Sequence, residues 1–437
     1  MTSSWSAFNM QNKVVITGTG LVSSLGLTVS ETWESILAGK QGIQPIHTFH
    51  ADGFACAAAA QVQGLDESAL GIHPRDSRIM DKHAYMLMKS SRDAFNQSKL
   101  DSSSVPAEDT GYFAGMGMVD YNIEDLLPAV IGSLNVKGAL DYDLFYSHAY
   151  QEIHPLWPLS MLNNISFCQV AIDLGIKGEN TVFSPHSDSG MHAIIEGHNT
   201  LIDKRAKVVL AGGVSEKVSP LSIARAAEFG ILNTTEKSTI SCRPFTKDRK
   251  GTVLGEGCGV LAIELHSSTV ERQVPVMAVI SGYGTSFEKM QGANCPTAGA
   301  ISAAMNNALV HANIKPSEID VIIAHGDDTF NGDRNEIAAI HNTFHKYSKD
   351  MTMFSSKSAL GHMLAGSSPV DVILGIQMLN HGIIPATYGS ESPGEDILLP
   401  IVTRTPVKTM PERILINSLS YEGQCASLIL EAADLLS

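Results

Sequence analysis

The sequence predicts an α/β protein made of two related halves. Short β-branched strands alternate with helical patterns along the chain, and strands of similar pattern recur in the same order. Strands that alternate with helices indicate parallel sheets with helices on both faces. We expect the first half over residues 12–265, the second half over 275–435, and a polar, charged linker at 266–273. Residues 1–11 are expected to form a flexible leader.

Three pairs of strand-like segments support the duplication. Each segment is a short run of apolar, mostly β-branched residues, and several of them end in glycine. One such match arises easily by chance, and three in the same order arise less easily. The pairs are Val14–Gly20 with Val279–Gly284, Lys207–Gly213 with Asp320–Gly326, and Gly259–Glu264 with Ala426–Glu431.

Helical patterns lie between the strands. Apolar residues recur on one side over 191–203 and over 332–345, and Pro369 stands near the first turn of a helix expected over 369–379. The segment 120–157 has little periodicity. We expect it to be an insertion that either caps the functional site or contacts a second subunit.

Composition and charge exclude several classes of protein. With 44% hydrophobic and 17% charged residues, the 437-residue chain is expected to be compact and soluble. A formal charge of −15 argues against general nucleic-acid binding. No apolar run reaches the roughly 20 residues that span a membrane, and Met1–Gln11 lacks the features of a signal peptide. The six scattered cysteines favour free thiols in a reducing cytoplasm, and nothing indicates a metal or a bound organic cofactor.

Ser187 occupies an expected strand-to-helix turn, where an enzyme of this layout carries its nucleophile. The backbone N–H groups at a helix N-terminus favour negative charge, so a cysteine there would become a thiolate. A serine hydroxyl needs an adjacent base as well. The same N–H groups can bind an oxyanion. The alternative is that Ser187 is simply the N-cap of the helix, since Ser-Asp-Ser before a helix is common.

Two histidines and a lysine are the other candidates. His325 follows four apolar residues at the end of an expected strand. It is either a structural residue or an N–H donor to a carbonyl oxygen. His362 follows Lys357 by five residues. Lys357 either holds a negative charge near the same pocket or is a solvated surface residue. His186 is of interest only because it precedes Ser187.

Longer motifs are more specific than these single residues. They are Val14–Gly26, the stretch Arg243–Gly257 that runs from Arg-Pro-Phe to Gly-Glu-Gly, His325-Gly with Gly332-Asp333 and Glu336, and Lys357 with Gly361-His362. Through these motifs, nearly the whole chain resembles the β-ketoacyl-acyl carrier protein synthases of type II fatty-acid and polyketide synthesis.

This resemblance implies a fold, a reaction and partners. The fold is the thiolase fold, with two βαβαβ-type halves in a five-layer αβαβα sandwich. In the family, a cysteine takes an acyl chain from acyl carrier protein, and two histidines help to decarboxylate a malonyl thioester and stabilise the enolate. No cofactor is implied, because the carrier protein delivers the phosphopantetheine arm. The chain is expected to form a homodimer, or a heterodimer with a cysteine-containing ketosynthase.

The resemblance also assigns the site residues. Ser187 matches the cysteine, so the nucleophile position holds a serine. His325 and His362 match the two histidines, and Lys357 matches the supporting lysine. Tyr421 matches a phenylalanine whose backbone N–H completes the oxyanion hole with that of Ser187.

Several departures from the family pattern fall at this site. Besides Ser187, they affect the residues after His325-Gly, the segment after His362 and the glycine-rich loop near the C-terminus. A glutamate in that loop adds negative charge and replaces a glycine that allows unusual backbone angles. This chain has Asp327 where the family has threonine and Phe330 where the family has proline. It has Ser420, Glu422, Ala365 and Ser368 where the family prefers glycine.

Basic residues in the first half suggest a surface for the partner. Arg75, Arg78 and Lys82 fall near where family members use basic residues to dock the acidic carrier protein. The alternative is a solvated helix face.

Three functions compete at this stage. The first is an acyltransferase of the 3-oxoacyl synthase type that uses Ser187. The second is a non-catalytic partner that resembles the chain-length factors and pairs with an active ketosynthase. The third is a decarboxylase that uses the histidines without a nucleophile.

Overall fold

The computed structural model describes residues 12–436, apart from 102–103, 119–122, 161, 185, 235–240, 289–293 and 398. The predicted leader at 1–11 therefore lies outside the described residues.

A mixed ten-stranded sheet runs through both halves in the order β10-β9-β13-β14-β8-β1-β7-β6-β4-β5. The halves meet where β1 pairs with β8 through residues 14–16 and 278–280. The first-half strands are β1 (Val14–Ser23), β4 (Thr110–Met116), β5 (Asn180–Phe183), β6 (Val208–Val214) and β7 (Gly257–Leu265). The second-half strands are β8 (Ala278–Phe287), β9 (Val321–Ile323), β10 (Thr352–Phe354), β13 (Arg413–Leu419) and β14 (Gln424–Ala432).

Both halves use the same strand order. If the five strands of each half are numbered in chain order, they lie in the sheet in the order 3-2-4-5-1 from the outer edge to the junction of the halves. This order shows that the predicted pair of Lys207–Gly213 with Asp320–Gly326 is wrong. These segments contain β6 and β9, but the counterpart of β6 is β13, and the counterpart of β9 is β4. The mismatch has a simple cause: both β6 and β9 are buried apolar runs beside parallel neighbours, and such runs look alike in sequence.

Two other expectations are wrong. The sheet is not all parallel, because β7 runs antiparallel to β1 and β6, and β14 runs antiparallel to β8 and β13. The expected linker at 266–273 is mostly the helix α12 (His266–Arg272). Its polar residues are anchored rather than solvated, since Arg272 donates to the buried carboxylate of Glu264 at 2.5 Å.

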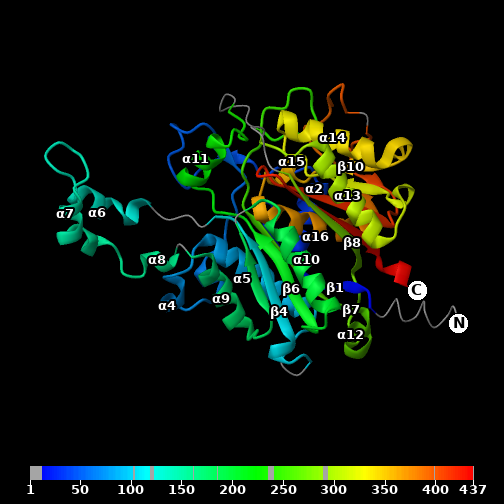
Figure 1. Ribbon diagram of the computed structural model, residues 1–437, viewed down its shortest axis with the longest axis horizontal. Helices are drawn as coiled ribbons and strands as arrows, with labels where there is room; N and C mark the ends of the chain where they lie inside the picture. The colour runs from blue at the N-terminus through cyan, green and yellow to red at the C-terminus, as the bar shows by residue number, and fades with distance from the viewer. Residues whose placement is uncertain are drawn as a thin grey trace.

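The helices and half-sheets form the five layers of the predicted thiolase-like fold, which is confirmed (Figure 1). α5 (Lys82–Gln97) and α9 (Asn163–Leu174) cover the outer face of the first half. α10 (Ser189–Ile202) and α16 (Ser367–His381) lie between the half-sheets. α13 (Ala298–Ala312) and α14 (Phe330–Phe344) cover the second half. Helices were correctly predicted at α10, α14 and α16.

The central layer carries the largest hydrophobic core. Met191 and Ile194 of α10 and Val370 and Ile373 of α16 are fully buried there, together with residues of both half-sheets. Burial of such side chains stabilises the fold by roughly 1.5–3 kcal/mol each. Because α10 and α16 both begin at the same end of this core, their first turns and the loops before them meet.

Shorter elements complete the chain. They are α2 (Val29–Leu37), α3 (Glu67–Leu70), α4 (Pro74–Ser77), α6 (Leu127–Gly132), α7 (Tyr142–Ser147), α8 (Trp157–Ser160), α11 (Pro220–Glu228) and α15 (Lys357–Leu360), with the two-residue strands β2 (Gln44–Pro45), β3 (Ala58–Ala59), β11 (Ile383–Ile384) and β12 (Val407–Lys408).

The predicted insertion forms a separate group of short helices. Figure 1 shows α6 and α7 standing away from the sheet and its covering helices. They expose large apolar side chains, among them Ile131, Tyr142 and Tyr146. A role in capping the site or in contacting a second subunit stays a prediction. So do the boundaries of the two halves, and residues 120–122 lie outside the described part.

Among the helices of the described chain, none combines the length and the apolar character that a membrane span requires.

Candidate active site

Ser187 lies in the predicted turn, between the end of β5 and the start of α10. The interpretation of Ser187 as the N-cap is wrong, because the N-cap is Asp188, whose side chain makes no capping hydrogen bond. Ser187 is 1% exposed. Its Oγ makes no hydrogen bond of good geometry among the described residues, although the Tyr421 phenol lies close enough to interact with it. A buried hydroxyl that is so weakly satisfied is costly, so it is a candidate for a functional role.

Close backbone packing brings this turn to the segment that contains His362. A Cβ atom on Gly190, in the first turn of α10, would lie 2.2 Å from the carbonyl oxygen of Ala365. Real Cβ contacts are never this short, so only glycine allows the approach. The sequence thereby positions the serine turn against the short helix that follows His362.

His362 is held by backbone and side-chain contacts. Its N–H donates to Val253 at 2.7 Å, and its carbonyl accepts from Gly255 at 2.9 Å. Its Nδ1 accepts from the backbone N–H of Leu364 at 3.2 Å, and Ser367 Oγ lies 3.2 Å from the same atom. An accepting Nδ1 places the hydrogen on Nε2. That Nε2 is buried without a partner among the described residues.

His325 follows β9 and is fixed in a similar way. The buried carboxylate of Glu336 accepts from the backbone N–H of His325 at 2.8 Å and of Gly326 at 2.9 Å. Asn417 donates to the same carboxylate at 2.9 Å. The Nδ1 of His325 accepts from the backbone N–H of Leu419 at 3.3 Å, so its Nε2 also carries the hydrogen.

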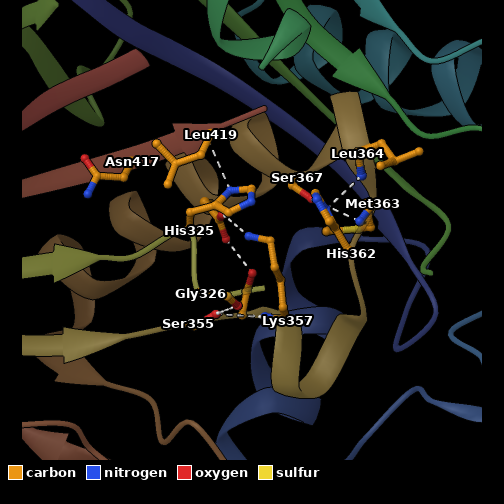
Figure 2. A network of polar contacts seen from close by, with 12 residues as sticks. His325, Gly326, Ser355, Lys357, His362, Met363, Leu364, Ser367, Asn417 and Leu419 are labelled. Atoms are coloured by element: carbon orange, nitrogen blue, oxygen red, sulfur yellow. Dashed lines mark hydrogen bonds and ion pairs between the residues drawn. The ribbon is translucent and has the colours of Figure 1, made fainter. Parts of the chain in front are cut away.

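The two imidazoles and Lys357 form one cluster, as Figure 2 shows. The ring centroids of His325 and His362 lie 5.1 Å apart at an interplanar angle of 82°. Burial, and then the Lys357 ammonium, hold the pKa of both imidazoles well below the ordinary value, so both are neutral near pH 7. Lys357 is fully buried, and its Nζ lies 3.7 Å from the Asp371 carboxylate. The interpretation of Lys357 as a surface charge is wrong.

This cluster can stabilise negative charge on oxygen. Two neutral imidazoles with hydrogens on Nε2 are donors, and a buried ammonium adds positive charge in a medium of low dielectric. The same tautomers cannot accept a proton at Nε2. Neither imidazole is therefore ready to serve as a general base for the Ser187 hydroxyl.

Tyr421 stands between two cavities. With His325 and Asp327 it lines a narrow one, and with Glu216 and Arg225 it lines another of about 140 Å³. Its phenol lies near Ser187, and burial raises its pKa. The oxyanion hole formed by the backbone N–H groups of Ser187 and Tyr421 stays a prediction.

The loop of residues 420–423, between β13 and β14, carries the altered positions. Ser420 Oγ donates to the carboxylate of Glu422. The same carboxylate lies 3.5 Å from Nδ1 of His186, the residue before the serine. A glutamate on this loop thus contacts the serine turn itself.

The residues after His325-Gly line two cavities. Asp327 lines the narrow cavity, and Thr329 and Phe330 line a wider one. Asp327 accepts from the N–H of Thr329 at 2.9 Å and from its hydroxyl at 2.7 Å. Burial raises the pKa of Asp328 to about 8. Phe330 lines a cavity of about 380 Å³, and the guanidinium of Arg249 lies 5.0 Å from its ring centroid.

The three basic residues predicted to dock a partner differ in their surroundings. Arg75 and Arg78 are exposed on and just after α4. Lys82 instead donates to Glu256 at 2.5 Å, and that carboxylate is 1% exposed. Because Lys82 neutralises a buried carboxylate, its charge is less available to a partner than those of the two arginines. Docking stays a prediction for all three.

Sequence reasoning missed Asp371, Ser367 and Asn417. Asp371 pairs with Lys357, Ser367 contacts His362, and Asn417 holds Glu336. One signal was available, because Ser367 and Asp371 lie one turn apart at the start of a mostly apolar and buried helix. Asn417 gives no comparable local signal, since its partner is 81 residues away.

Comparisons with known proteins identify the family of the chain. Two family descriptions match, "Beta-ketoacyl synthase, N-terminal domain" over residues 11–269 and "Beta-ketoacyl synthase, C-terminal domain" over 277–391. A 3-oxoacyl-[acyl-carrier-protein] synthase 2 of Coxiella burnetii is 29% identical over 96% of this chain and 98% of its own. One from Staphylococcus aureus is 28% identical, with the same coverage.

Solved structures are similar over nearly the whole chain. The ishigamide ketosynthase/chain length factor has a TM-score of 0.84 at 25% identity, and the match covers 97% of this chain and 99% of that chain. A type II polyketide acyl-carrier protein in complex with its ketosynthase, bound to the hexaketide, has a TM-score of 0.85 at 23% identity, covering 97% and 100%.

Proposed function

The chain belongs to the β-ketoacyl synthase family, and we propose that it acts on acyl and malonyl thioesters of an acyl carrier protein with Ser187 at the acyl-accepting position. In this proposal His325, His362 and Lys357 form the decarboxylation site. The observation that carries it is the pair of neutral imidazoles, fixed by Leu419 and Leu364 so that both Nε2 atoms are donors.

Before condensation, Ser187 Oγ attacks the acyl thioester, the C–S bond breaks, and the hydroxyl proton goes to the departing carrier-protein thiol, which leaves an acyl ester on Ser187. Condensation then has two parts. In the first, the bond to the malonyl carboxylate breaks, CO2 leaves, and its electron pair moves onto the thioester carbonyl oxygen, where the two N–H donors stabilise the enolate. In the second, the enolate carbon attacks an acyl ester on Ser187. The ester C–O bond then breaks, and Oγ takes a proton as the 3-oxoacyl thioester leaves.

Acyl transfer to Ser187 is the slower part in this proposal. The start of α10 can stabilise an oxyanion, but a helix N-terminus does not by itself ionise an alcohol. The imidazoles are donors, and His186, the residue before Ser187, has its Nδ1 3.5 Å from the Glu422 carboxylate. Decarboxylation needs no such base, so we expect it to be the faster activity.

A second candidate function has its own support. The missing base, together with Glu422 in contact with the serine turn, suits a non-catalytic subunit that pairs with a cysteine-containing ketosynthase. One similar solved structure is described as a ketosynthase/chain length factor. In that case the chain forms a heterodimer, whereas the first proposal also permits a homodimer.

The deciding experiment uses acyl carrier protein that bears a labelled acyl chain. Intact mass is measured after incubation with the wild-type protein and with Ser187→Ala. An adduct that disappears in Ser187→Ala supports acyl transfer to the serine. No adduct with any chain length, together with co-purification of a cysteine-containing homologue, supports the partner subunit and contradicts the first proposal.

A further inference from the structure

Two hydroxyl groups meet at the serine turn. The Tyr421 phenol lies close enough to the Ser187 hydroxyl to interact with it, and this is the one polar contact of that hydroxyl among the described residues. The adjacent residues of the two segments meet as well, because the Glu422 carboxylate lies 3.5 Å from Nδ1 of His186. The loop of residues 420–423 therefore contacts the serine turn at two successive positions.

The Tyr421 side chain is supported by the end of α11. Its ring packs against that of Phe229, the residue that follows this helix, with ring centroids 4.9 Å apart at an interplanar angle of 41°. Arg225, in the last turn of α11, donates to Glu216 at 2.7 Å. Both charged side chains line the cavity of about 140 Å³ that Tyr421 also lines. The phenol thus has an ion pair near it as well as the Ser187 hydroxyl.

The phenol keeps its proton near neutral pH. Burial, followed by the charges of the Glu422 and Glu216 carboxylates, raises its pKa. The contact with Ser187 and the charge of Arg225 act in the opposite direction and are weaker. A neutral phenol has one O–H to donate and an oxygen that accepts. It can therefore take a proton from one neighbour and give its own proton to another in the same step.

We propose that Tyr421 is a catalytic residue whose phenol relays a proton between the Ser187 hydroxyl and the thiol of the carrier protein. The inference rests on the proposed function and deepens it, because it supplies a proton transfer that the two imidazoles are not ready to perform. Its basis is the contact between two hydroxyl groups at positions where the resemblance predicts a cysteine and a phenylalanine. An alcohol needs such help to react, whereas a thiol at a helix N-terminus does not.

The relay balances in both stages of the reaction. During acylation, Ser187 Oγ attacks the thioester carbon and its proton moves to the phenol oxygen, while the phenol proton moves to the sulfur as the C–S bond breaks. During condensation, the ester C–O bond breaks and the phenol gives its proton to Oγ. Tyr421 then regains a proton from solvent water, for which the cavity beside it has room.

The test compares a serine and a cysteine with and without the phenol. Tyr421→Phe keeps the ring and removes only the hydroxyl, and intact-mass kinetics with acyl carrier protein measure acylation. With Ser187 in place, Tyr421→Phe is expected to slow acylation by at least about 10²-fold. In the Ser187→Cys protein the same change is expected to alter the rate by less than about threefold. A merely structural role would give equal losses in both, because a displaced loop hinders either nucleophile.

Another buried tyrosine of the chain gives a matched control. The Tyr112 phenol lies 3.2 Å from the Ser91 hydroxyl, and its ring stacks on that of Phe167 with centroids 4.4 Å apart. Tyr112→Phe thus removes a similar contact in the outer core of the first half and is expected to leave acylation unchanged. Release of CO2 from malonyl carrier protein is expected to stay within a few-fold of the wild type in Tyr421→Phe. Melting temperatures verify that the variants are folded.

A second probe makes the test independent of acyl transfer. An alkyl fluorophosphonate bonds through phosphorus to Ser187 Oγ with loss of HF, so its labelling rate reports how readily the hydroxyl reacts. Labelling that falls at least about 10²-fold in Tyr421→Phe, without any acyl adduct on the wild type, leaves the relay standing and contradicts acyl transfer to Ser187. An acyl adduct that forms equally fast in Tyr421→Phe does the reverse. Equal losses in the serine and cysteine proteins overturn the relay, and neither labelling nor adduct overturns both proposals.

Discussion

The two sides of the site differ in how completely their groups are held. On the proposed decarboxylation side, His325, His362 and Lys357 each have a defined partner, which is distant in sequence for His325 and local for the other two. On the acyl side, the Ser187 hydroxyl has only its contact with the Tyr421 phenol among the described residues, and Glu422 contacts the turn before it. The charge-stabilising groups are thus held more firmly than the Ser187 hydroxyl.

The largest expected effect concerns the ion pair between Asp371 and Lys357 on the proposed decarboxylation side. Asp371→Ala removes the partner of the fully buried Lys357 and leaves an uncompensated charge, so the free energy of unfolding is expected to drop by about 3–5 kcal/mol. Denaturant unfolding measures it. Asp203→Ala, at the exposed pair with Arg205, is the matched control and is expected to cost less than about 1 kcal/mol. Equal costs for the two variants would show that Lys357 does not depend on Asp371.

Removal of one donor tests the chemistry of that side. In His325→Ala or His362→Ala the enolate loses one of two N–H donors, and the rate of CO2 release from malonyl carrier protein is expected to fall by roughly 10²–10³. Ser187→Ala, in the same assay, is expected to stay within a few-fold of the wild type. A similar loss in all three variants would contradict the separation of the two sides.

A cysteine tests the acyl side directly. Ser187→Cys places a thiol at the start of α10, where the helix N-terminus lowers a thiol pKa, so acylation is expected to rise by roughly 10² without any added base. Intact-mass kinetics with acyl carrier protein measure the rate. No gain in Ser187→Cys would mean that Glu422 or the changed loop, rather than the serine, limits this side.

A pH dependence of stability is expected from the loop after His325, where burial raises the pKa of Asp328 to about 8. Between its unfolded value of 3.8 and about 8, the folded state binds more protons at this group than the unfolded state does. The free energy of unfolding therefore falls as the pH rises toward 8, by up to about 1.4 kcal/mol per pH unit, and levels off above it.

Asp328→Asn is expected to remove this slope. The imidazoles act in the opposite direction and at lower pH, because their lowered pKa values make the folded state lose stability as the pH falls below 6.5. Urea unfolding between pH 5 and 9 separates the two trends. An unchanged slope above pH 6.5 in Asp328→Asn would assign it to another buried carboxyl, such as Asp333 or Glu336.

The sequence predicted local features well and long-range ones poorly. The periodicity of α10 and the β-branched start of β1 are local patterns, and both elements were identified, although β1 continues past the predicted end at Gly20 to Ser23. The counterpart of β6 was misidentified because strand order is a property of the whole sheet. The polar helix α12 was taken for a linker because the burial of Glu264, its anchor, is not visible in sequence.

The same limit applied at the site. His325, His362 and Lys357 were identified through motifs, which record residue type and spacing. The tautomer of His325 depends on the backbone N–H of Leu419, 94 residues away, and that of His362 depends on the backbone N–H of Leu364, which motif spacing does not reveal. The ion pair of Glu216 and Arg225 was not anticipated, although its partners lie nine residues apart, because nothing in the local pattern indicates which cavity they line.

The central claim is that the decarboxylation side works while Ser187 accepts acyl groups slowly. The most direct test follows CO2 release and acyl adduct formation in one reaction, with malonyl and acyl carrier protein supplied together to the wild-type protein. The account predicts CO2 release that is at least tenfold faster than adduct formation, with the gap closed in Ser187→Cys. Adduct formation on Ser187 as fast as CO2 release, or no CO2 release at all, would contradict it.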